Sequence, residues 1–265
     1  MAKHAGVARH AWNWGLATCK EIYEAGGKLP TAIDLHKRLV AEVKSQNPWY
    51  DEVSKCSPQE ALRNLNKAFK RVWQVKGTGF PKFKKKNVKD SFYLEGIKVS
   101  GYWVKLPRIG WVKSHEQLPP VNPKNVTISK RAGDWYISFK IDVEPQATPK
   151  VRERIGVDIG IKTLATLSDG TTYPNPKTYR HAKKKLAKLQ KELSRRQKGG
   201  KNREKTQLKL AKAHRRIADI RSDHLHKLTA YLAKNHGEVK IEDLNVSGML
   251  KSHKLAGAIA LWWVL

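Results

Sequence analysis

A forty-residue segment, residues 177–216, contains 17 lysines and arginines and only 2 acidic residues. Apolar residues recur along it at three- and four-residue steps, and the pattern continues to residue 235 with one break at "KGGK". This spacing predicts two long helices over 177–235. Because a helical run this basic loses stability by internal repulsion, a phosphate backbone lying along it is the simplest compensation. The alternative is a helical face that is merely solvated.

The whole chain is strongly basic, with 53 lysines and arginines against 23 acidic residues and a net charge of +30. No fold requires such a charge, and it repels itself unless a polyanion neutralises it, so nucleic acid is the expected partner. A basic membrane-surface protein is the competing interpretation. We find neither a long apolar span nor a signal peptide, and therefore expect a cytoplasmic protein that does not bind a membrane.

The chain has 265 residues, of which 40% are hydrophobic and nine are tryptophan, so it can fill a core. Cys19 and Cys56 are its two cysteines. They are too far apart in sequence for a C-x-x-C ligand pair and too few for a disulfide framework. We therefore expect structural thiols and no zinc ribbon in this chain.

Residues 1–76 are predicted to be helical, since apolar residues recur at helical spacing in "AWNWGLATCKEIYEA" and "ALRNLNKAFKRVW". Ser57, followed by Pro58 and Glu60, is typical of a helix start with Ser57 as the N-cap. Large apolar residues of this region are expected to pack in a core: Trp12, Trp14, Leu16 and Trp73.

Residues 77–146 change character, because glycines and prolines separate short alternating runs such as "NVTISKR" and "DWYISFKIDVE". This pattern predicts a small β-barrel or a strongly twisted sheet. Its first segment, "GTGFPKFKKKNVKDSF", interleaves Phe80, Phe83 and Phe92 with lysines. Basic residues bind phosphates and aromatic rings stack on bases, so the segment fits a nucleic-acid surface. The alternative is that the rings are core and the lysines are solvated.

The stretch "RIGVDIGIKTLATLSDG", residues 154–170, follows a predicted linker, "PQATPKVRER". It indicates two short strands, and Asp169-Gly170 is a hairpin dipeptide that leads to a third strand at "TTY". We expect a β-meander here, and a further strand at "EVKIEDLNVSGML" after the basic helices.

Each of these two apolar regions carries an acid at a strand position. Alternation predicts that Ile155 and Val157 share one face and that Asp158 lies on the other; Glu242 lies opposite Val239 and Ile241 in the same way. Acidic residues are poor strand formers and costly when buried, so both need a partner. A metal ion is one candidate, since carboxylates on adjacent strands that hold Mg²⁺ cleave phosphodiesters. An ion pair of Asp158 with Arg152 or Arg154 is the other.

Several stretches, in order along the chain, resemble the TnpB (OrfB) proteins of small bacterial transposons, which are RNA-guided DNA nucleases related to the type V CRISPR effectors. They are "ARHAWNWGLA", "ALRNLNKAFKRVW", "GFPKFKKKNVKDSF", "RIGVDIGIKTLATLSDG", "DHLHKLT" and "VKIEDLNVSGMLKSHKLA". The resemblance implies an α+β multidomain fold: a β-barrel (wedge) with a helical recognition insert, then a RuvC-type, RNase H-like α/β domain. It assigns residues 1–76 to the recognition region, 77–146 to the barrel and 147–265 to a partial nuclease domain.

The resemblance also implies the site. Asp158 matches the first catalytic aspartate and Glu242 the catalytic glutamate, so both are expected to bind Mg²⁺, whereas Asp243 matches no ligand. The implied partners are a guide RNA from the transposon end and a double-stranded DNA target. The basic residues predicted to contact nucleic acid are Lys82, Lys84, Lys85, Lys86, Lys183, Lys184, Lys185, Arg195, Arg196, Lys201 and Arg203.

The sequence departs from the family pattern at both ends. In the family, a barrel strand and a short helix usually precede the segment that resembles "GVARHAWNWGLA", which here starts at residue 6, so the front of the barrel is expected to be missing. No acidic residue follows Asp243, and "AIALWWVL" at the end is wholly apolar. We therefore expect the third catalytic aspartate and the zinc ribbon to be absent, and the chain to cleave DNA poorly or not at all.

Two other functions fit the sequence. One is a nuclease-incompetent relative that uses guide RNA to occupy DNA, as a repressor or a gene remnant. The other is an RNase H-like resolvase that works without RNA. The basic helices and "FPKFKKK" disfavour the resolvase, because a junction enzyme needs less surface that tracks a duplex. The guide, the target-adjacent motif and the oligomeric state are not determined by the sequence.

Overall fold

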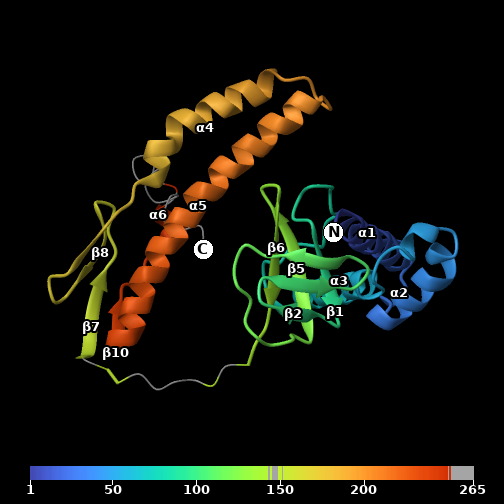
Figure 1. Cartoon of the computed structure of the whole chain (residues 1–265), viewed down its shortest axis with the longest axis horizontal. Helices are drawn as coiled ribbons and strands as arrows, with labels where there is room; N and C mark the ends of the chain where they lie inside the picture. Colours follow the sequence, from blue (N-terminus) through green and yellow to red (C-terminus); the bar gives the residue numbers. More distant parts are fainter. Residues whose placement is uncertain (143, 145–148, 151, 250, 252–265) are drawn as a thin grey trace. The chain divides into compact units, whose positions relative to one another are not determined.

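The chain divides into two compact units, Met1–Val143 and Glu144–Leu265 (Figure 1). The computed structural model describes residues 1–142, 144, 149–150, 152–249 and 251. Most of the predicted linker and the apolar end "AIALWWVL" lie outside these described residues. Both units combine helices with small sheets, so the expected mixed α+β organisation is confirmed.

The first unit begins with helices and continues with strands. The helical elements are α1 (Ala2–Glu24), α2 (Ala32–Arg38), a π-helical turn (Leu39–Lys44), a 3-10 turn (Pro48–Tyr50) and α3 (Cys56–Gln74). The strands are β1 (Ser91–Glu95), β2 (Lys98–Ser100), β3 (Trp103–Leu106), β4 (Gly110–Lys113), β5 (Asn125–Arg131) and β6 (Asp134–Phe139). They form two antiparallel sheets of three strands, in the orders β1-β5-β6 and β2-β3-β4.

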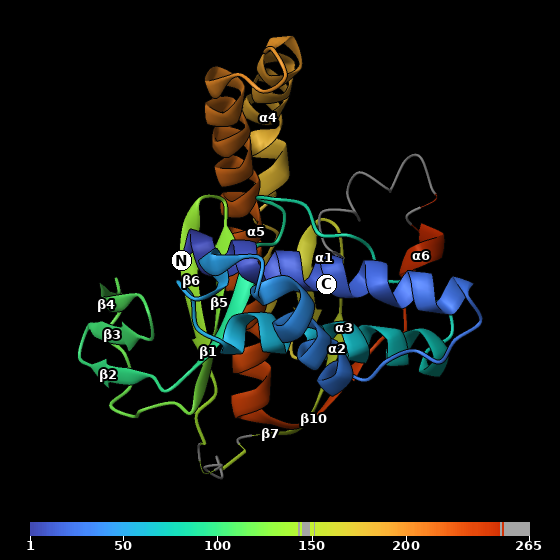
Figure 2. The ribbon, with the colours of Figure 1, turned by 90° about the vertical axis from the view of Figure 1, so that its right-hand side faces the viewer.

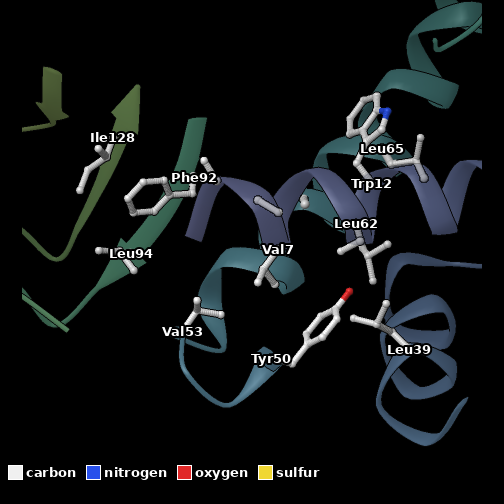
Figure 3. Close-up of a cluster of buried hydrophobic side chains, with 14 of the residues drawn as sticks. Val7, Trp12, Leu39, Tyr50, Val53, Leu62, Leu65, Phe92, Leu94 and Ile128 are labelled. Atoms are coloured by element: carbon white, nitrogen blue, oxygen red, sulfur yellow. The ribbon is translucent and has the colours of Figure 1, made fainter. Parts of the chain in front are cut away.

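One hydrophobic core serves both the helices and the strands of this unit (Figure 3). Helices α1 and α3 lie side by side and run in the same direction (Figure 2). They approach closely at Gly15, where an added Cβ would lie 2.7 Å from a methyl carbon of Leu62. Phe92 and Leu94 of β1 and Ile128 of β5 extend the core into the first sheet. Apolar residues at helical spacing in the helices and at every second position in the strands thus form one continuous core.

The expected core residues divide into two groups. Trp12 and Leu16 are buried, and Trp14 packs against the core while partly exposed. Trp73 contradicts the prediction, because its side chain is 59% exposed. It lies in the last turn of α3 and stacks on Phe69, which leaves more than half of its side chain open to solvent.

The start of α3 also differs from the prediction. The helix begins at Cys56, and Ser57 is a buried residue inside its first turn rather than the N-cap. The Ser57 hydroxyl donates to the Tyr93 carbonyl oxygen of β1 at 3.2 Å. Ser54 takes part of the capping role, since its Oγ accepts from the Cys56 N–H at 3.4 Å. Tertiary contact with β1 therefore determines what Ser57 binds.

Both cysteines are buried and free. Burial raises the pKa of the Cys19 thiol to about 11. The thiol is therefore protonated at neutral pH and packs as a small apolar side chain.

The second unit consists of one mixed sheet and a long helical hairpin. Its elements are β7 (Arg152–Asp158), β8 (Thr163–Leu167), β9 (Thr172–Pro174), α4 (Thr178–Arg195), α5 (Lys201–Asn235), β10 (His236–Ile241) and the short α6 (Val246–Met249). The sheet order is β10-β7-β8-β9. Strands β7, β8 and β9 form the expected antiparallel meander, with Gly170 at φ +85° in the predicted turn. After the hairpin the chain returns as β10, parallel to β7.

Helix α5 covers one face of this sheet (Figure 1). Leu228 and Leu232 of α5 pack with Ile155 and Val157 of β7 and with the apolar residues of β8. The basic first half of α5 instead pairs with α4. The two predicted helices are thus confirmed, and the break between them is at "KGGK", where Gly199 has φ +83°.

Polar contacts join α4 and α5 near this break. The Thr206 side chain is 2% exposed, and its hydroxyl donates to the Glu192 carboxylate at 3.0 Å. Hydrogen bonds from Arg196 and Thr206 lower the pKa of Glu192. The Arg203 guanidinium donates to the carbonyl oxygens of Leu193 and of Arg196, the latter at 3.1 Å. The Leu193 carbonyl also accepts from the Arg196 N–H at 3.3 Å. Both carbonyls lie at the C-terminal end of α4, so Arg203 caps that helix.

No helix among the described residues is long and apolar enough to span a bilayer.

We predict that Arg203→Ala destabilises the helical hairpin by about 1–2 kcal/mol, because it removes hydrogen bonds from a charged donor to the end of α4. Arg195→Ala should change the free energy of unfolding by less than about 0.5 kcal/mol, since the exposed Arg195 side chain makes no such contact. Urea unfolding followed by far-ultraviolet circular dichroism measures both. Equal effects of the two variants would contradict the capping role.

A second prediction concerns His4 in the first unit. Its side chain is 2% exposed, and Nε2 accepts from the Ser54 N–H at 3.2 Å. Burial lowers the pKa of His4 to about 4. An unfolded histidine has a pKa of about 6.5, so between about pH 6.5 and pH 4 the unfolded chain is protonated at this histidine and the folded chain is not. Stability is therefore present above about pH 6.5 and is lost as the pH falls towards 4, by about 2 kcal/mol at pH 5.

The matched variants are His4→Asn and His115→Asn, since His115 is exposed. Urea unfolding at pH 7 and pH 5 should show a smaller pH dependence for His4→Asn than for the natural chain. His115→Asn should keep the natural dependence. An unchanged dependence in His4→Asn would show that other groups cause it.

Candidate functional site

Asp158 and Glu242 are brought together by the parallel pairing of β7 with β10. The register aligns Val239 with Ile155, Lys240 with Gly156 and Ile241 with Val157. Asp158 is the residue after Val157, and Glu242 is the residue after Ile241. The two carboxylates therefore occupy equivalent positions at the carboxyl ends of neighbouring strands.

The faces of these strands follow the predicted alternation for β7. Ile155 and Val157 are buried under α5, whereas Asp158 is exposed on the opposite face. Paired residues of parallel strands share a face, so Glu242 follows the side of Asp158. The side chains of Val239 and Ile241, however, are 39% and 63% exposed. Strand β10 is the edge of the described sheet, and α5 does not extend over it far enough to bury both.

The two carboxylates line a shallow, open pocket on the uncovered face of the sheet. The other lining residues are Gly156, Val157, Thr166, Leu167, Ser168, Lys240 and Ile241. Asp158 pairs with Thr166 of β8 in the antiparallel register. Three adjacent strands thus contribute to one site, and Lys240 adds a positive charge beside the two negative ones.

Gly156 and Ser168 fix the floor of this pocket. The Gly156 N–H donates to Ser168 Oγ at 3.0 Å, and the Ser168 N–H donates to the Gly156 carbonyl at 2.9 Å. A Cβ at position 156 would lie 3.4 Å from Ser168 Cβ. Glycine therefore keeps the surface before Asp158 clear of bulk.

The arginines near Asp158 are engaged elsewhere. Arg152 forms an ion pair with Asp169, and Arg154 pairs with Glu238 at 2.7 Å. Hydrogen bonds from the Thr171 N–H and from Arg152 lower the pKa of Asp169. Within the described part of the chain, neither Asp158 nor Glu242 has a hydrogen-bond or ion-pair partner. The alternative of an Asp158–arginine pair is therefore wrong.

Burial does not explain these acids either, because both are exposed. What distinguishes them is that they are adjacent and that, among the described residues, neither carboxylate forms an ion pair; the pocket lysine, Lys240, lies 3.9 Å from Glu238 instead. Exposed carboxylate oxygens at neighbouring positions are the ligands that Mg²⁺ prefers, so the residues fit two ligands of such an ion. Over residues 1–142, 144, 149–150, 152–249 and 251, no group of three or more His, Cys, Asp or Glu residues gathers into a metal site.

The predicted basic residues of the second unit have two roles. Two of them, Lys184 and Arg195, line one concave surface of α4 together with Lys188 and Lys191, which the prediction did not include; we call these four residues the α4 stripe. Their spacing places them on one side of the helix, and all four are exposed. Lys183, Lys185 and Lys201 are also exposed. Arg196 and Arg203 are different, since Arg196 pairs with Glu192 at 2.9 Å and Arg203 caps α4.

The predicted lysines of the first unit lie on a segment held against α1. Trp12 Nε1 donates to the Lys82 carbonyl at 3.1 Å. The Asn13 amide donates to the Lys84 carbonyl and accepts from the Lys84 N–H, at 3.0 and 2.7 Å. Lys84 Nζ lies 3.9 Å from the centre of the Trp12 ring, and burial lowers the pKa of Lys84. Lys82, Lys85 and Lys86 are exposed, whereas the Lys84 ammonium packs on tryptophan.

Periodicity in the sequence did not reveal two features, one in each unit. Phe92 is core, while Phe80 and Phe83 are exposed although all three belong to the same segment. Lys240 lines the carboxylate pocket, and its only signal in the sequence is its place two residues before Glu242. Both depend on which strand or helix covers a residue.

Comparison with known proteins identifies relatives of both units. A family model described as "Probable transposase" (OrfB_IS605) matches residues 138–253, and the helix-turn-helix model of the same family matches residues 1–28. The chain is 37% identical over 260 residues to "Putative RNA-guided DNA endonuclease InsQ" of Escherichia coli (strain K12). It is 36% identical over 219 residues to "Putative RNA-guided DNA endonuclease" of Streptomyces pristinaespiralis.

These alignments cover 95% and 79% of this chain, which spans 64% and 54% of the length of the two relatives. A solved structure, "Cryo-EM structure of the Cas12f1-sgRNA-target DNA complex", aligns with 99% of this chain and 73% of its own at 15% identity. Its TM-score of 0.28 is too low to show a common fold. The two family models and the relatives that align over most of its length show that the chain belongs to the OrfB family of IS605-type transposon proteins.

Proposed function

We propose that this chain is an RNA-guided DNA-binding protein whose second unit is a Mg²⁺-dependent nuclease site built on Asp158 and Glu242. The observation that carries the proposal is the register of β7 with β10, which puts two exposed acids without cationic partners side by side. Relatives that bear the name of RNA-guided DNA endonuclease support the guide RNA and the DNA target as partners.

The pocket around the acids suits a phosphodiester. It is open and shallow, so a polymer can lie across it without entering a cavity. Asp158 and Glu242 would hold the ion from adjacent strands, and Lys240 would attract a phosphate oxygen beside them. Bound Mg²⁺ supplies an activated water and stabilises the charge on the leaving oxygen. The glycine at 156 leaves room for the backbone of the substrate.

The basic helices supply the binding surface for the nucleic acid. The α4 stripe has four cations on one side of a helix of 18 residues. Cations at this spacing follow a phosphate backbone, and the energy comes from release of counterions rather than from base contacts. Arg203 contributes indirectly, because it bonds α5 to the end of α4 and so holds the hairpin that presents the stripe, whereas the Arg196 side chain pairs with Glu192 within α4.

We also assign the finer architecture on this basis. The sheet β10-β7-β8-β9, with α5 on one face, corresponds to the core of an RNase H-like domain of the RuvC type. Helices α1 to α3 correspond to the recognition insert, and the two three-stranded sheets to the wedge barrel. The short sheets of the first unit and its shared core are compatible with this assignment.

The first test concerns the two acids. Asp158→Asn and Glu242→Gln should each weaken Mg²⁺ binding at least about tenfold, because each removes one of two charged ligands. Asp243→Asn is the matched control, since it removes the same charge from the adjacent exposed residue, which does not line the pocket. Calorimetric titration of Mg²⁺ into the full chain measures the three affinities.

Cleavage of target DNA with the copurified RNA is the second readout of the same variants. Cleavage that disappears in Asp158→Asn and persists in Asp243→Asn supports the nuclease. A chain that binds RNA and target DNA without cutting would be a guided DNA-binding module instead. Equal Mg²⁺ affinities of Asp158→Asn and Asp243→Asn would contradict the metal site.

The other test concerns the α4 stripe. Lys188→Gln with Lys191→Gln should reduce the slope of log affinity against log salt by about one for each of these lysines that binds a phosphate. The control is Lys98→Gln with Lys105→Gln, two exposed lysines that pair across β2 and β3. Equal slopes for both double variants would show that the stripe has no special role.

Sequencing the RNA that copurifies with the natural chain separates the guided functions from the resolvase. One dominant RNA species supports guidance. Purified protein without bound RNA supports an RNase H-like enzyme that acts on DNA alone.

A further inference from the structure

Four exposed aromatic rings gather at the ends of α1 and α3 in the first unit. Their side chains are between 41% and 59% exposed: Tyr23, Trp73, Phe80 and Phe83. Tyr23 is in the last turn of α1 and Trp73 in the last turn of α3, while Phe80 and Phe83 lie on the segment that follows α3. Figure 2 shows the two helices side by side in this unit.

Three of the four rings are linked to one buried residue, Phe69, either directly or through Phe80. Trp73 stacks on Phe69 with centroids 6.1 Å apart, and Phe80 meets Phe69 edge to face at 5.3 Å. Tyr23 lies 6.3 Å from Phe80. Phe69 itself is 3% exposed. The exposed rings are therefore anchored to the core on one side and open to solvent on the other.

The surroundings are cationic. Lys20 Nζ lies 5.0 Å from the centre of the Phe83 ring. Residues 67–86, which contain three of the four rings, have eight lysines and arginines and no acidic residue. Glu21 and Glu24 are the acids nearest to Tyr23 in sequence. A protein partner selected by apolar contact alone would gain nothing from so many cations, whereas a polyanion would.

The platform is also held in position before any ligand binds. The Trp12 indole and the Asn13 amide fix the backbone of Lys82 and Lys84, on either side of Phe83. Preorganised rings lose little conformational freedom when a base stacks on them.

We propose that Tyr23, Trp73, Phe80 and Phe83 form a stacking platform for the bases of single-stranded nucleic acid. Lys20 and Lys82 would contact the phosphates of the same strand. Exposed ring faces stack on unpaired bases, whereas the bases of a duplex are already stacked on each other. The platform rests on the proposed function, since guided binding of DNA leaves single-stranded RNA and a displaced DNA strand. It is in the first unit and contains none of the residues of the carboxylate pocket or the α4 stripe.

The test compares stacking with mere apolar contact. In the full chain, Trp73→Leu with Phe83→Leu should weaken binding of a fluorescent single-stranded RNA about tenfold or more, as loss of base stacking does. The salt dependence should stay unchanged, because no cation is removed. Binding of a duplex of the same sequence should change less than about twofold. Trp73→Tyr with Phe83→Tyr should restore most of the affinity, since tyrosine also stacks.

The matched control is Tyr102→Leu with Trp111→Leu, since these two rings in the same unit are 47% and 50% exposed. It should bind single-stranded RNA like the natural chain. The proposal is overturned if the platform variant binds like the natural chain, if it loses duplex and single-strand binding equally, or if it loses thermal stability and no RNA affinity. The last result would mean that the rings are covered by another part of the protein.

These outcomes differ from failure of the proposed function. A natural chain that binds no RNA at all contradicts both proposals. RNA binding that depends on the α4 stripe and not on the rings contradicts the platform alone.

Discussion

The pairing of β7 with β10 is the constraint on which the second unit depends. The two strands are separated in sequence by a meander and by the whole helical hairpin, yet they align in parallel with one fixed register. In a parallel pair, aligned residues lie on the same face of the sheet. Val157 is aligned with Ile241, so the residues that come next, Asp158 and Glu242, are neighbours. If β10 shifted by one residue relative to β7, Glu242 would point to the α5 face of the sheet and would no longer lie beside Asp158. The hydrophobic contacts of Ile155 and Val157 with α5 fix the face on which β7 presents Asp158.

Ion pairs within the chain determine which acidic and basic side chains are left to bind a metal ion or a nucleic acid. Arg152 and Arg154 each pair with another acid, so neither arginine forms an ion pair with the two pocket carboxylates. In the helical hairpin, the Arg203 guanidinium bonds α5 to the end of α4 and Arg196 pairs with Glu192, while the α4 stripe stays exposed. A basic protein thus has one locally acidic pocket and one locally unneutralised cationic surface. That contrast is what a site for cutting a polyanion requires.

Sequence reasoning succeeded where one periodic pattern had one strong interpretation. The two long helices, the turn at Asp169-Gly170 and the alternation around Asp158 follow directly from spacing and turn chemistry. It failed where coverage by another element decides burial. Trp73 has the helical spacing of a core residue but is mostly exposed. Ser57 is a residue type that often caps a helix, but its hydroxyl donates to a carbonyl oxygen of β1 instead. Lys84 belongs to a basic run, yet its ammonium packs on Trp12.

The sequence by itself determined the family, the basic charge and its concentration in the helical hairpin, and the identity of the two acids, because these depend on residue type and on spacing along the chain. The tertiary structure decided which residues meet. It placed Asp158 beside Glu242 and paired the nearby arginines with other acids. It also brought Trp73 and Phe80 onto Phe69, with Tyr23 next to Phe80 and Lys20 over the Phe83 ring. Such contacts depend on strand register and on where each helix ends relative to its neighbours, and neither is encoded in a local pattern.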